Sequence, residues 1–350
     1  MKILYDHQIF SSQKFGGISR YHIQLIKNLE AEWEIPLFFS NNFYLKELMA
    51  APEFFNKTNF RGKNRILERL NRIKTISTIK KRCFDVFHPT FYDSYAIEYI
   101  KDKPMVLTVH DMIHDRFPEL PAAKWEMREK YIMAHRANAI IVPSKFTADE
   151  LMALYNIPAS KIHVVYHGSP EWEIPSIPIE ENRFLFVGGR TYYKNFSVVL
   201  KALKLVPDSK LVIAGSPLNN LEKELINTLG INEQIKVVNP NDEELKRLYA
   251  SSSALIFPSK MEGFGLPILE AFAANCPVIC SDIPVFKEIC GDAALFFPPD
   301  SPQKLAYMMQ KNIKERFTEN IIKRLQNFSW KKCGDITQNI YEEILSTKLS

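Results

Sequence analysis

The sequence lacks the marks of a disulfide-bonded, zinc-binding or membrane-spanning protein. Its five cysteines are odd in number and include no C-x-x-C pair. Three of them lie in apolar stretches of the second half, which favours buried reduced thiols; the five are Cys83, Cys276, Cys280, Cys290 and Cys333. No apolar run approaches the length of a membrane span. The opening MKILYDHQIF is interrupted by Asp6, which favours an internal strand over a signal peptide, so we expect a cytoplasmic protein.

Other absences narrow the function. There is no G-x-G-x-x-G motif, which disfavours a nicotinamide-dependent enzyme. The net charge of +5 arises in the first half, the second half is close to neutral, and no nucleic-acid-binding module is recognisable, so nucleic acid is not an expected partner. What remains is 350 residues with 46% hydrophobic content, which suits a soluble protein of two domains.

Positive charge is concentrated between Lys57 and Arg82, where many lysines and arginines face a single acid, Glu68. Apolar residues recur among them at roughly helical spacing: Ile66, Leu67, Leu70, Ile73, Ile76 and Ile79. A basic amphipathic helix of this kind can lie on the inner face of an anionic membrane. The alternative is an ordinary helix with a solvated basic face, and charge pattern alone does not decide between them.

Apolar strand-like runs alternate with helical patterns along the chain, which predicts two α/β layers with mostly parallel sheets. The first half has strand candidates at Ile3–Tyr5, Ile35–Phe39, Val86–His88, Met105–His110, Ala139–Val142 and Ile162–Tyr166. The second has them at Phe184–Val187, Leu211–Ala214, Ile235–Val238, Ala254–Phe257, Val278–Cys280 and Ala294–Phe297. We predict a first domain over residues 1–168, a proline- and acid-rich linker over 169–182, a second domain over 183–328 and a final helix over 329–350.

The segment PSKMEGFGLPILE, residues 258–270, follows a buried strand candidate and enters a glycine loop before a helix expected from Pro267. Such a strand, loop and helix N-terminus form an anion site, because free N–H groups and the helix dipole point the same way. Two acids separated by seven residues, Glu262 and Glu270, flank the loop. Two carboxylates beside a bound anion would repel it unless they bind something else, such as sugar hydroxyls. The alternative is that they are ordinary acids at helix termini.

A second glycine turn stands in FLFVGGRTYYKN, residues 184–195. The strand candidate ends at Val187, and Arg190 and Lys194 follow the turn before a helix capped by Asn195 or Ser197. An arginine fork and a mobile lysine ammonium can together neutralise a diphosphate.

In the first half, Gly16-Gly17 precedes a helix and allows close backbone approach to a ligand. The loop from Asp6 to Phe15 has no assignable role. His110-Asp111 comes directly after a strand candidate, where an imidazole faces the ligand edge of the sheet. His88 and Ser144 also follow strands, and either could line an acceptor site or serve the structure.

The E-x7-E motif, preceded by G-R-x-x-x-K-N, resembles glycosyltransferase family 4, whose enzymes are retaining and use sugar nucleotides. The resemblance covers nearly the whole chain and is weakest from Asn41 to Arg82. It implies an α/β GT-B fold: two facing Rossmann-like domains with a C-terminal helix crossing back to the first domain. The first domain would bind the acceptor and the second the nucleotide-sugar.

The resemblance also assigns roles. Glu270 would bind the ribose and Glu262 the transferred sugar, while backbone N–H groups near Phe264 hold the distal phosphate. The implied donor-binding set is Gly17, Gly189, Arg190, Lys194, Glu262, Gly263, Phe264, Gly265, Leu266 and Glu270. The implied catalytic set is His110, Glu262, Arg190 and Lys194. The implied acceptor set is Gly16, Asp111, His88 and Ser144. His114 and Asp115 lack a standard metal-ligand spacing, no D-x-D motif is present, and neither metal nor cofactor is expected.

The TVHD, VPSKFT and EGFGLPILEA segments look most like bacterial mannosyltransferases of O-antigen or capsule synthesis. We therefore expect transfer of a hexose, mannose from GDP-mannose being favoured, to a glycan or lipid-linked oligosaccharide. Domain closure would exclude water, and attack would occur on the front face with retention. The alternatives are a UDP- or dTDP-sugar donor, a sugar-nucleotide epimerase, or a non-catalytic nucleotide-sugar-binding protein.

Overall fold

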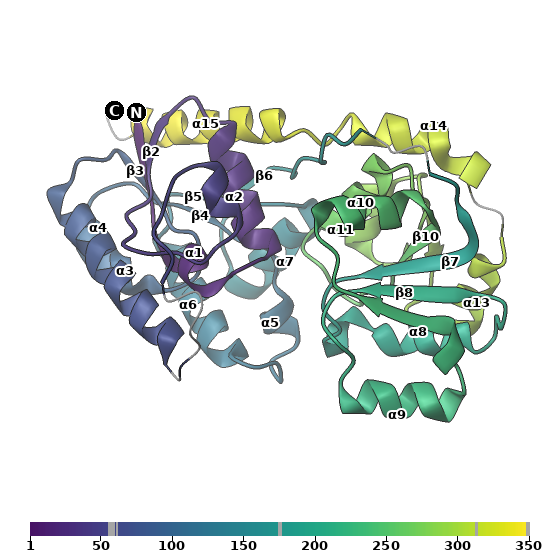
Figure 1. Ribbon diagram of the computed structural model, residues 1–350. Coiled ribbons are helices and arrows are strands. Elements are labelled where there is room, and N and C mark those ends of the chain that lie inside the picture. Colours follow the sequence, from purple (N-terminus) through teal and green to yellow (C-terminus); the bar gives the residue numbers. More distant parts are fainter. Residues whose placement is uncertain (55–59, 61, 174–176, 312–313, 348–350) are drawn as a thin grey trace. The chain divides into compact units, whose positions relative to one another are not determined.

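A computed structural model describes residues 1–54, 60, 62–173, 177–311 and 314–347, without the side chains of residues 314–317. The chain forms two compact units (Figure 1). The first contains Met1–His167 together with Trp330–Ser350, and the second contains Gly168–Ser329. The part of the predicted basic stretch around Lys57 lies outside the described residues. No helix among those that the structure describes is both long and apolar enough to cross a membrane.

The first unit is built on parallel strands. One three-stranded sheet has the order β2-β1-β3, formed by Glu32–Glu34, Lys2–Tyr5 and Val86–His88. Another has the order β4-β5-β6, formed by Val106–Thr108, Ala139–Val142 and Ile162–Val164. An isolated parallel bridge between Phe87 and Met105 joins the two. The strand order reverses between β1 and β3, so a ligand site is expected at their carboxyl ends.

Helices complete the first unit: α1 (Gln8–Ser12), α2 (Gly17–Lys27), α3 (Lys63–Lys81), α4 (Ile97–Ile100), α5 (Ile113–Arg116), α6 (Ala123–Arg136), α7 (Lys145–Tyr155) and α15 (Trp330–Ser346). The last of these returns from the far end of the chain and packs against α2 and β5 (Figure 1). Its Tyr341 is fully buried, with its hydroxyl 3.1 Å from that of Tyr5. The core of the first unit is therefore closed by residues from both ends of the sequence.

The second unit contains one six-stranded parallel sheet in the order β12-β11-β10-β7-β8-β9. The strands are β7 (Glu180–Val187), β8 (Lys210–Ala214), β9 (Ile235–Val238), β10 (Ser252–Phe257), β11 (Val278–Ser281) and β12 (Leu295–Phe297). Counted from β7 this is the doubly wound Rossmann order 3-2-1-4-5-6, whose direction reverses between β7 and β10. The carboxyl ends of these two strands are the expected ligand site.

The helices of the second unit are α8 (Phe196–Leu203), α9 (Asn220–Leu229), α10 (Asp242–Ala250), α11 (Leu266–Ala273), α12 (Pro284–Cys290), α13 (Pro302–Met309) and α14 (Lys314–Leu325). Two of them start with reciprocal capping boxes, Asn219 with Glu222 on α9 and Asn241 with Glu244 on α10. The α11 helix begins at Leu266, one residue before the predicted start at Pro267, after Gly265 with φ of 115°.

Several predicted elements differ in the structure. The strand predicted over Ile35–Phe39 is wrong: β2 occupies Glu32–Glu34 instead, and Pro36 has no N–H to donate to a ladder. The unassigned loop between Asp6 and Phe15 contains the short helix α1. All five cysteines are free, and four of them are buried, whereas Cys83 is exposed.

The buried face of helix α3 contains both polar and apolar side chains: Asn71, Thr75 and Thr78 together with Leu67 and Ile79. Asn71 is fully buried and accepts hydrogen bonds from the N–H groups of Phe38 and Phe39 at 2.9 and 3.2 Å. It also donates to the carbonyl of Phe39 and the hydroxyl of Ser11. Ile66 and Ile73 are instead 46% and 55% exposed. Two apolar side chains therefore lie on the solvent side of this basic helix.

Candidate functional site

In the second unit, the two glycine-containing segments follow β7 and β10, the adjacent strands at the reversal point of the sheet. Hydrogen bonds join the segments. The N–H of Lys260 donates to the carbonyl of Tyr193 at 2.7 Å, and the Asn195 amide donates to the carbonyl of Pro258 at 3.2 Å. Asn195 lies at the start of α8 as predicted, but its backbone is left-handed, with φ of 55°, and its side chain makes no cap hydrogen bond. The fold therefore brings the G-R-x-x-x-K-N and E-x7-E motifs to one place.

Lys194 and Glu262 meet directly. The Lys194 ammonium lies 2.6 Å from Oε1 of Glu262, and the Ser259 hydroxyl donates to the same oxygen at 2.6 Å. The glutamate side chain is 10% exposed and the lysine side chain 21%. A carboxylate that already accepts two hydrogen bonds on one oxygen is fixed in orientation, and its other oxygen can face a ligand.

Arg190 is oriented by groups that follow β8. Its Nε donates to Glu222 at 2.8 Å, and its Nη2 donates to the carbonyls of Ser216 and Pro217. Nη1 is buried and has no hydrogen-bond partner among the described residues. This nitrogen would lie 3.7 Å from a Cβ built on Gly215. The unsatisfied N–H group is therefore held at the strand ends, where an anion can accept from it.

Glycines line the same carboxyl edge of the sheet and place no side chain there. Gly188 has φ of 105°, a left-handed conformation that disfavours other residues, while Gly189 follows it in the turn. A Cβ on Gly215 would approach the Gly188 carbonyl oxygen to 2.9 Å, so the two turns pack backbone against backbone. Gly265 ends the second segment, after Gly263 and the buried Phe264. The α11 N-terminus, beginning at Leu266, adds its positive dipole end to this edge.

Glu270 lies in the second turn of α11. It is 7% exposed and accepts a hydrogen bond from the Tyr249 hydroxyl of α10 at 2.9 Å. The two acids of the E-x7-E motif therefore have separate partners on separate elements.

In the first unit, Gly16 and Gly17 form the N-terminus of α2, after β1. Gly16 has an extended backbone, and a Cβ there would meet the Gln13 side chain at 2.2 Å. The Gln13 side chain accepts from the N–H of Ser19, which closes the turn over the helix start. Gly17 is exposed, so its backbone is accessible.

His110 follows β4, and its N–H donates to the Tyr92 hydroxyl at 2.9 Å. Burial lowers the pKa of the imidazole to about 4, an effect that neighbouring Asp111 opposes and Lys130 reinforces. Its Nε2 has no hydrogen-bond partner among the described residues. The ring is therefore neutral at physiological pH and retains one free hydrogen-bonding nitrogen. Asp111 is partly exposed and accepts from the N–H of Ile113.

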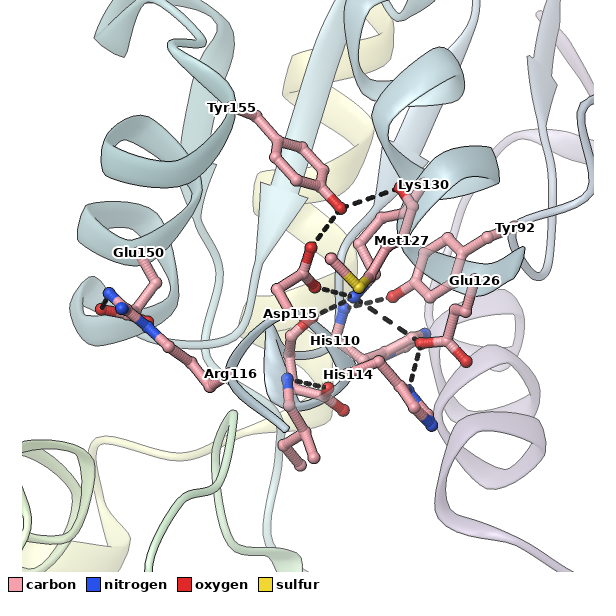
Figure 2. A network of polar contacts seen from close by, with 12 residues as sticks. Tyr92, His110, His114, Asp115, Arg116, Glu126, Met127, Lys130, Glu150 and Tyr155 are labelled. Carbon is pink, nitrogen blue, oxygen red and sulfur yellow. Dashed lines mark hydrogen bonds and ion pairs between the residues drawn. The ribbon is translucent and has the colours of Figure 1, made fainter. Parts of the chain in front are cut away.

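A polar network lies directly behind this turn (Figure 2). Tyr155 and Lys130 both contact Asp115, and Lys130 also lies 3.6 Å from Glu126. His114 Nδ1 lies 2.8 Å from Glu126, a carboxylate that raises the pKa of this histidine. His114 and Asp115 both take part in this network. No group of three or more His, Cys, Asp or Glu side chains in the described part of the chain is arranged to hold a metal ion.

Two predicted acceptor residues have structural roles instead. His88 is fully buried, with Nδ1 2.6 Å from the Tyr341 hydroxyl and Nε2 2.9 Å from that of Thr108, so neither ring nitrogen remains for an acceptor. Ser144 is also buried and caps α7 by accepting from the N–H of Thr147 at 3.0 Å. We therefore withdraw both from the acceptor set.

Sequence reasoning missed the residues that hold the predicted ones: Ser259, Glu222, Tyr249, Tyr92 and Lys130. Glu222 forms part of an N-x-x-E capping box, which by itself signals only a helix start. Lys130 lies in a helix rich in charge, AKWEMREKYIMAHR, where a buried lysine has no distinct pattern. Only Ser259, three residues before Glu262 in the motif segment, carried a local signal.

Two family models match consecutive parts of the chain. Residues 15–170 match "Glycosyltransferase Family 4" and residues 171–328 match "Glycosyl transferases group 1". Among curated relatives, the O-antigen chain mannosyltransferase RfbU of Salmonella typhimurium is 31% identical over 63% of this chain and 64% of its own length, so the match spans a little under two thirds of that relative. O-antigen chain mannosyltransferase B of Escherichia coli is 27% identical over 93% of this chain and 96% of its own.

Solved structures agree on the fold. Anabaena HepE, in a complex with UDP and glucose, superposes with a TM-score of 0.76 at 16% identity over 98% of this chain and 99% of its own. Both units have the doubly wound α/β architecture of GT-B proteins, and the C-terminal helix α15 returns to the first unit. From its motifs, its fold and these relatives, the chain belongs to glycosyltransferase family 4 and is a glycosyltransferase enzyme.

Proposed function

We propose that this enzyme is a hexosyltransferase that moves mannose from GDP-mannose to a glycan or lipid-linked oligosaccharide during cell-surface polysaccharide synthesis. The names of the two O-antigen mannosyltransferase relatives support the sugar and the pathway class. The donor is a nucleoside diphosphate sugar because the second unit offers cationic groups, glycine turns and a helix N-terminus at one sheet edge.

The observation that carries this proposal is the Nη1 nitrogen of Arg190, buried and without a partner at the ends of β7 and β8. A diphosphate oxygen would satisfy it. Lys194 and the α11 dipole would share the charge that develops on the phosphate as the sugar leaves. Such groups stabilise the transition state more than the bound donor, because the negative charge grows during the reaction.

We also propose the remaining roles, which the resemblance to the family motifs implies. Glu270 binds the ribose hydroxyls and Glu262 the hydroxyls of the transferred sugar, with phosphate held by backbone N–H groups near Gly265. In the first unit, His110 contacts the sugar, Gly17 approaches the donor, and Gly16 and Asp111 serve the acceptor.

We further propose that the anomeric configuration is retained by front-face attack, with the leaving phosphate taking the acceptor proton. Glu262 is a poor candidate for a covalent nucleophile, because one of its oxygens already binds both Lys194 and Ser259. NMR of the first-formed product should show the anomeric configuration of the donor. A trapped glycosyl–enzyme adduct, or an inverted product, would contradict this mechanism.

The donor can be identified by thermal shift with GDP, UDP, dTDP and CMP. A ligand at about a hundred times its Kd adds roughly 2.7 kcal/mol of stability. Stabilisation by GDP alone supports the proposal. Stabilisation by UDP, the nucleotide bound in the Anabaena structure, or by dTDP would keep the enzyme class and change the donor. No response to any nucleotide would contradict the proposed site.

Transfer assays with labelled GDP-mannose should then show dependence on an added acceptor. An epimerase would convert the donor without an acceptor, and a non-catalytic binding protein would leave it unchanged. We also propose that no metal is needed, because Arg190 and Lys194 supply the counter-charge; turnover should persist in excess EDTA. Loss of turnover in EDTA that Mg²⁺ restores would contradict this part.

A further inference from the structure

Lys130 of α6 is a lysine with no solvent exposure. A buried ammonium is costly unless charged and polar partners surround it, and such partners must be kept in place. A side chain without solvent exposure does not contribute to solubility. The buried charge of Lys130 therefore needs another explanation. It lies beside the turn that carries His110 and Asp111 (Figure 2).

The partners of Lys130 come from two elements. Its ammonium lies 2.9 Å from Oδ2 of Asp115 on α5 and 3.6 Å from Oε1 of Glu126 on its own helix. The other Asp115 oxygen accepts from the Tyr155 hydroxyl. The ammonium also lies 5.2 Å from the centre of the Tyr92 ring, a cation–π contact. These contacts fix the position of the charge.

The same ammonium holds the His110–Asp111 turn. Its Nζ donates to the backbone carbonyl of Asp111 at 3.0 Å. Tyr92, whose ring it contacts, accepts the backbone N–H of His110 at 2.9 Å. Both peptide groups on either side of this turn are thus bound by one lysine and the tyrosine packed against it.

The charge also acts on the imidazole. Titratable and aromatic groups lie around His110: Asp111 beside it, Tyr92 after β3, Lys130 on α6, Tyr21 and His22 on α2, His88 on β3, and His167. Burial is the main cause that lowers the pKa of His110, and Lys130 lowers it further, while Asp111 raises it. The cation thus favours the neutral ring, whose buried Nε2 has no hydrogen-bond partner among the described residues.

We propose that Lys130 is a positioning residue for sugar transfer: it holds the His110–Asp111 turn in place and fixes a positive charge beside the His110 imidazole. This inference rests on the proposed function, in which His110 contacts the donor sugar. Lys130 itself touches no substrate, because it is fully buried.

The test compares Lys130→Met with Arg116→Met. Arg116 lies on α5, beside the same network, but pairs with Glu150 at the surface, so its loss removes an ion pair without touching the turn (Figure 2). We expect Lys130→Met to lower kcat by about 10- to 100-fold through misplacement of the imidazole. The acid limb of kcat/KM should move to higher pH, and the NMR titration midpoint of His110 should rise by roughly half a pH unit or more. Arg116→Met should change none of these.

An unchanged His110 midpoint in folded Lys130→Met overturns the proposal, and so does a shifted midpoint with normal kcat. If Lys130→Met does not fold, Asp115→Asn decides, because it removes the carboxylate charge 2.9 Å from the Lys130 ammonium and leaves His110 and Asp111 unchanged. A normal kcat in Asp115→Asn then overturns the proposal, and a lowered kcat with a shifted His110 midpoint supports it. Absence of transfer by the wild-type enzyme would instead contradict the proposed function, while the His110 titration still tests the charge effect.

Discussion

At the scale of single residues, the two acids of the E-x7-E motif have different surroundings. Glu262 is bound by a lysine and a serine, whereas Glu270 accepts from the hydroxyl of Tyr249. A ligand hydroxyl at Glu262 meets a carboxylate whose charge is partly compensated. A ligand hydroxyl at Glu270 meets a carboxylate whose partner is neutral. This carboxylate keeps its full charge and can bind a pair of ribose hydroxyls more strongly.

Replacing Glu270 by Ala should therefore weaken nucleotide binding by roughly 1–3 kcal/mol, because charged hydrogen bonds to the ribose are lost. Calorimetric titration with the stabilising nucleotide measures this directly. Tyr249→Phe is the matched control: it removes the partner hydroxyl and leaves the carboxylate, and affinity should change far less. Wild-type affinity in Glu270→Ala would exclude Glu270 from the nucleotide site.

Asn71 offers a second residue-scale test, on stability. Its amide binds the N–H groups of Phe38 and Phe39, which Ala cannot replace. Asn71→Ala should lower the free energy of unfolding of the first unit by about 1–3 kcal/mol. Asn64→Ala, at an exposed position of the same helix, should be neutral or slightly stabilising. Equal stability of the two variants in urea would show that the Asn71 hydrogen bonds contribute nothing.

At the scale of elements, α3 combines exposed basic residues with the outward-facing Ile66 and Ile73. Some of its cations have partners within the protein: Arg72 pairs with Asp93, and Lys80 lies over the Tyr99 ring. Arg69 is exposed. This arrangement agrees with the hypothesis that α3 lies on an anionic membrane surface, in which case the two isoleucines would enter the headgroup region.

Arg69→Glu should weaken binding to vesicles containing phosphatidylglycerol by about 1–2 kcal/mol, since each basic residue near such a surface contributes about 1 kcal/mol. Lys223→Glu makes the same change in charge at an exposed position of α9 and should leave vesicle binding unaltered. Sedimentation with vesicles at low salt gives the comparison. Equal effects of the two substitutions would show that α3 is an ordinary solvated surface helix without a specific role in vesicle binding.

At the scale of the whole molecule, the first unit contains several buried histidines that are neutral when folded. Burial lowers the pKa of His7 and His110 to about 4 and that of His88 to about 3, and it also lowers the pKa values of His22 and His167. In the unfolded chain these groups take up protons near pH 6.5. Between about pH 6.5 and 4 the unfolded state therefore binds more protons, and stability decreases as the pH falls.

The Tm of the first unit should thus decline from pH 7.5 to pH 5, each such histidine contributing up to about 1.4 kcal/mol per pH unit. Differential scanning calorimetry across this range measures the decline. His88→Gln removes one of these titrating groups, so its Tm should depend less steeply on pH, even if the variant is less stable overall. A Tm that stays constant over the range would show that the histidines are not neutral in the fold.

Much of the architecture could be predicted from the sequence, because apolar runs and glycine turns are local signals. The strand candidates overlap the observed strands except at Ile35–Phe39. There the apolar run favoured a strand, although Pro36 has no N–H to donate to a neighbouring strand. The motif residues after β7 and β10 could be named for the same reason. Their partners could not: Glu222 approaches Arg190, and Lys130 approaches Asp111, through packing between helices and loops distant in sequence. The acceptor role predicted for His88 is wrong because its hydrogen-bond partner, Tyr341, lies on the last helix, far away in the sequence.

The return of α15 to the first unit has a consequence for synthesis on the ribosome. The second unit is continuous in sequence and can fold as soon as it has left the ribosome. The core of the first unit stays incomplete until Tyr341 and its neighbours have been synthesised. At about ten residues per second, that interval lasts on the order of ten to twenty seconds. The half of the protein made first is therefore completed last, and its unfinished core is the part of the nascent chain most in need of a chaperone.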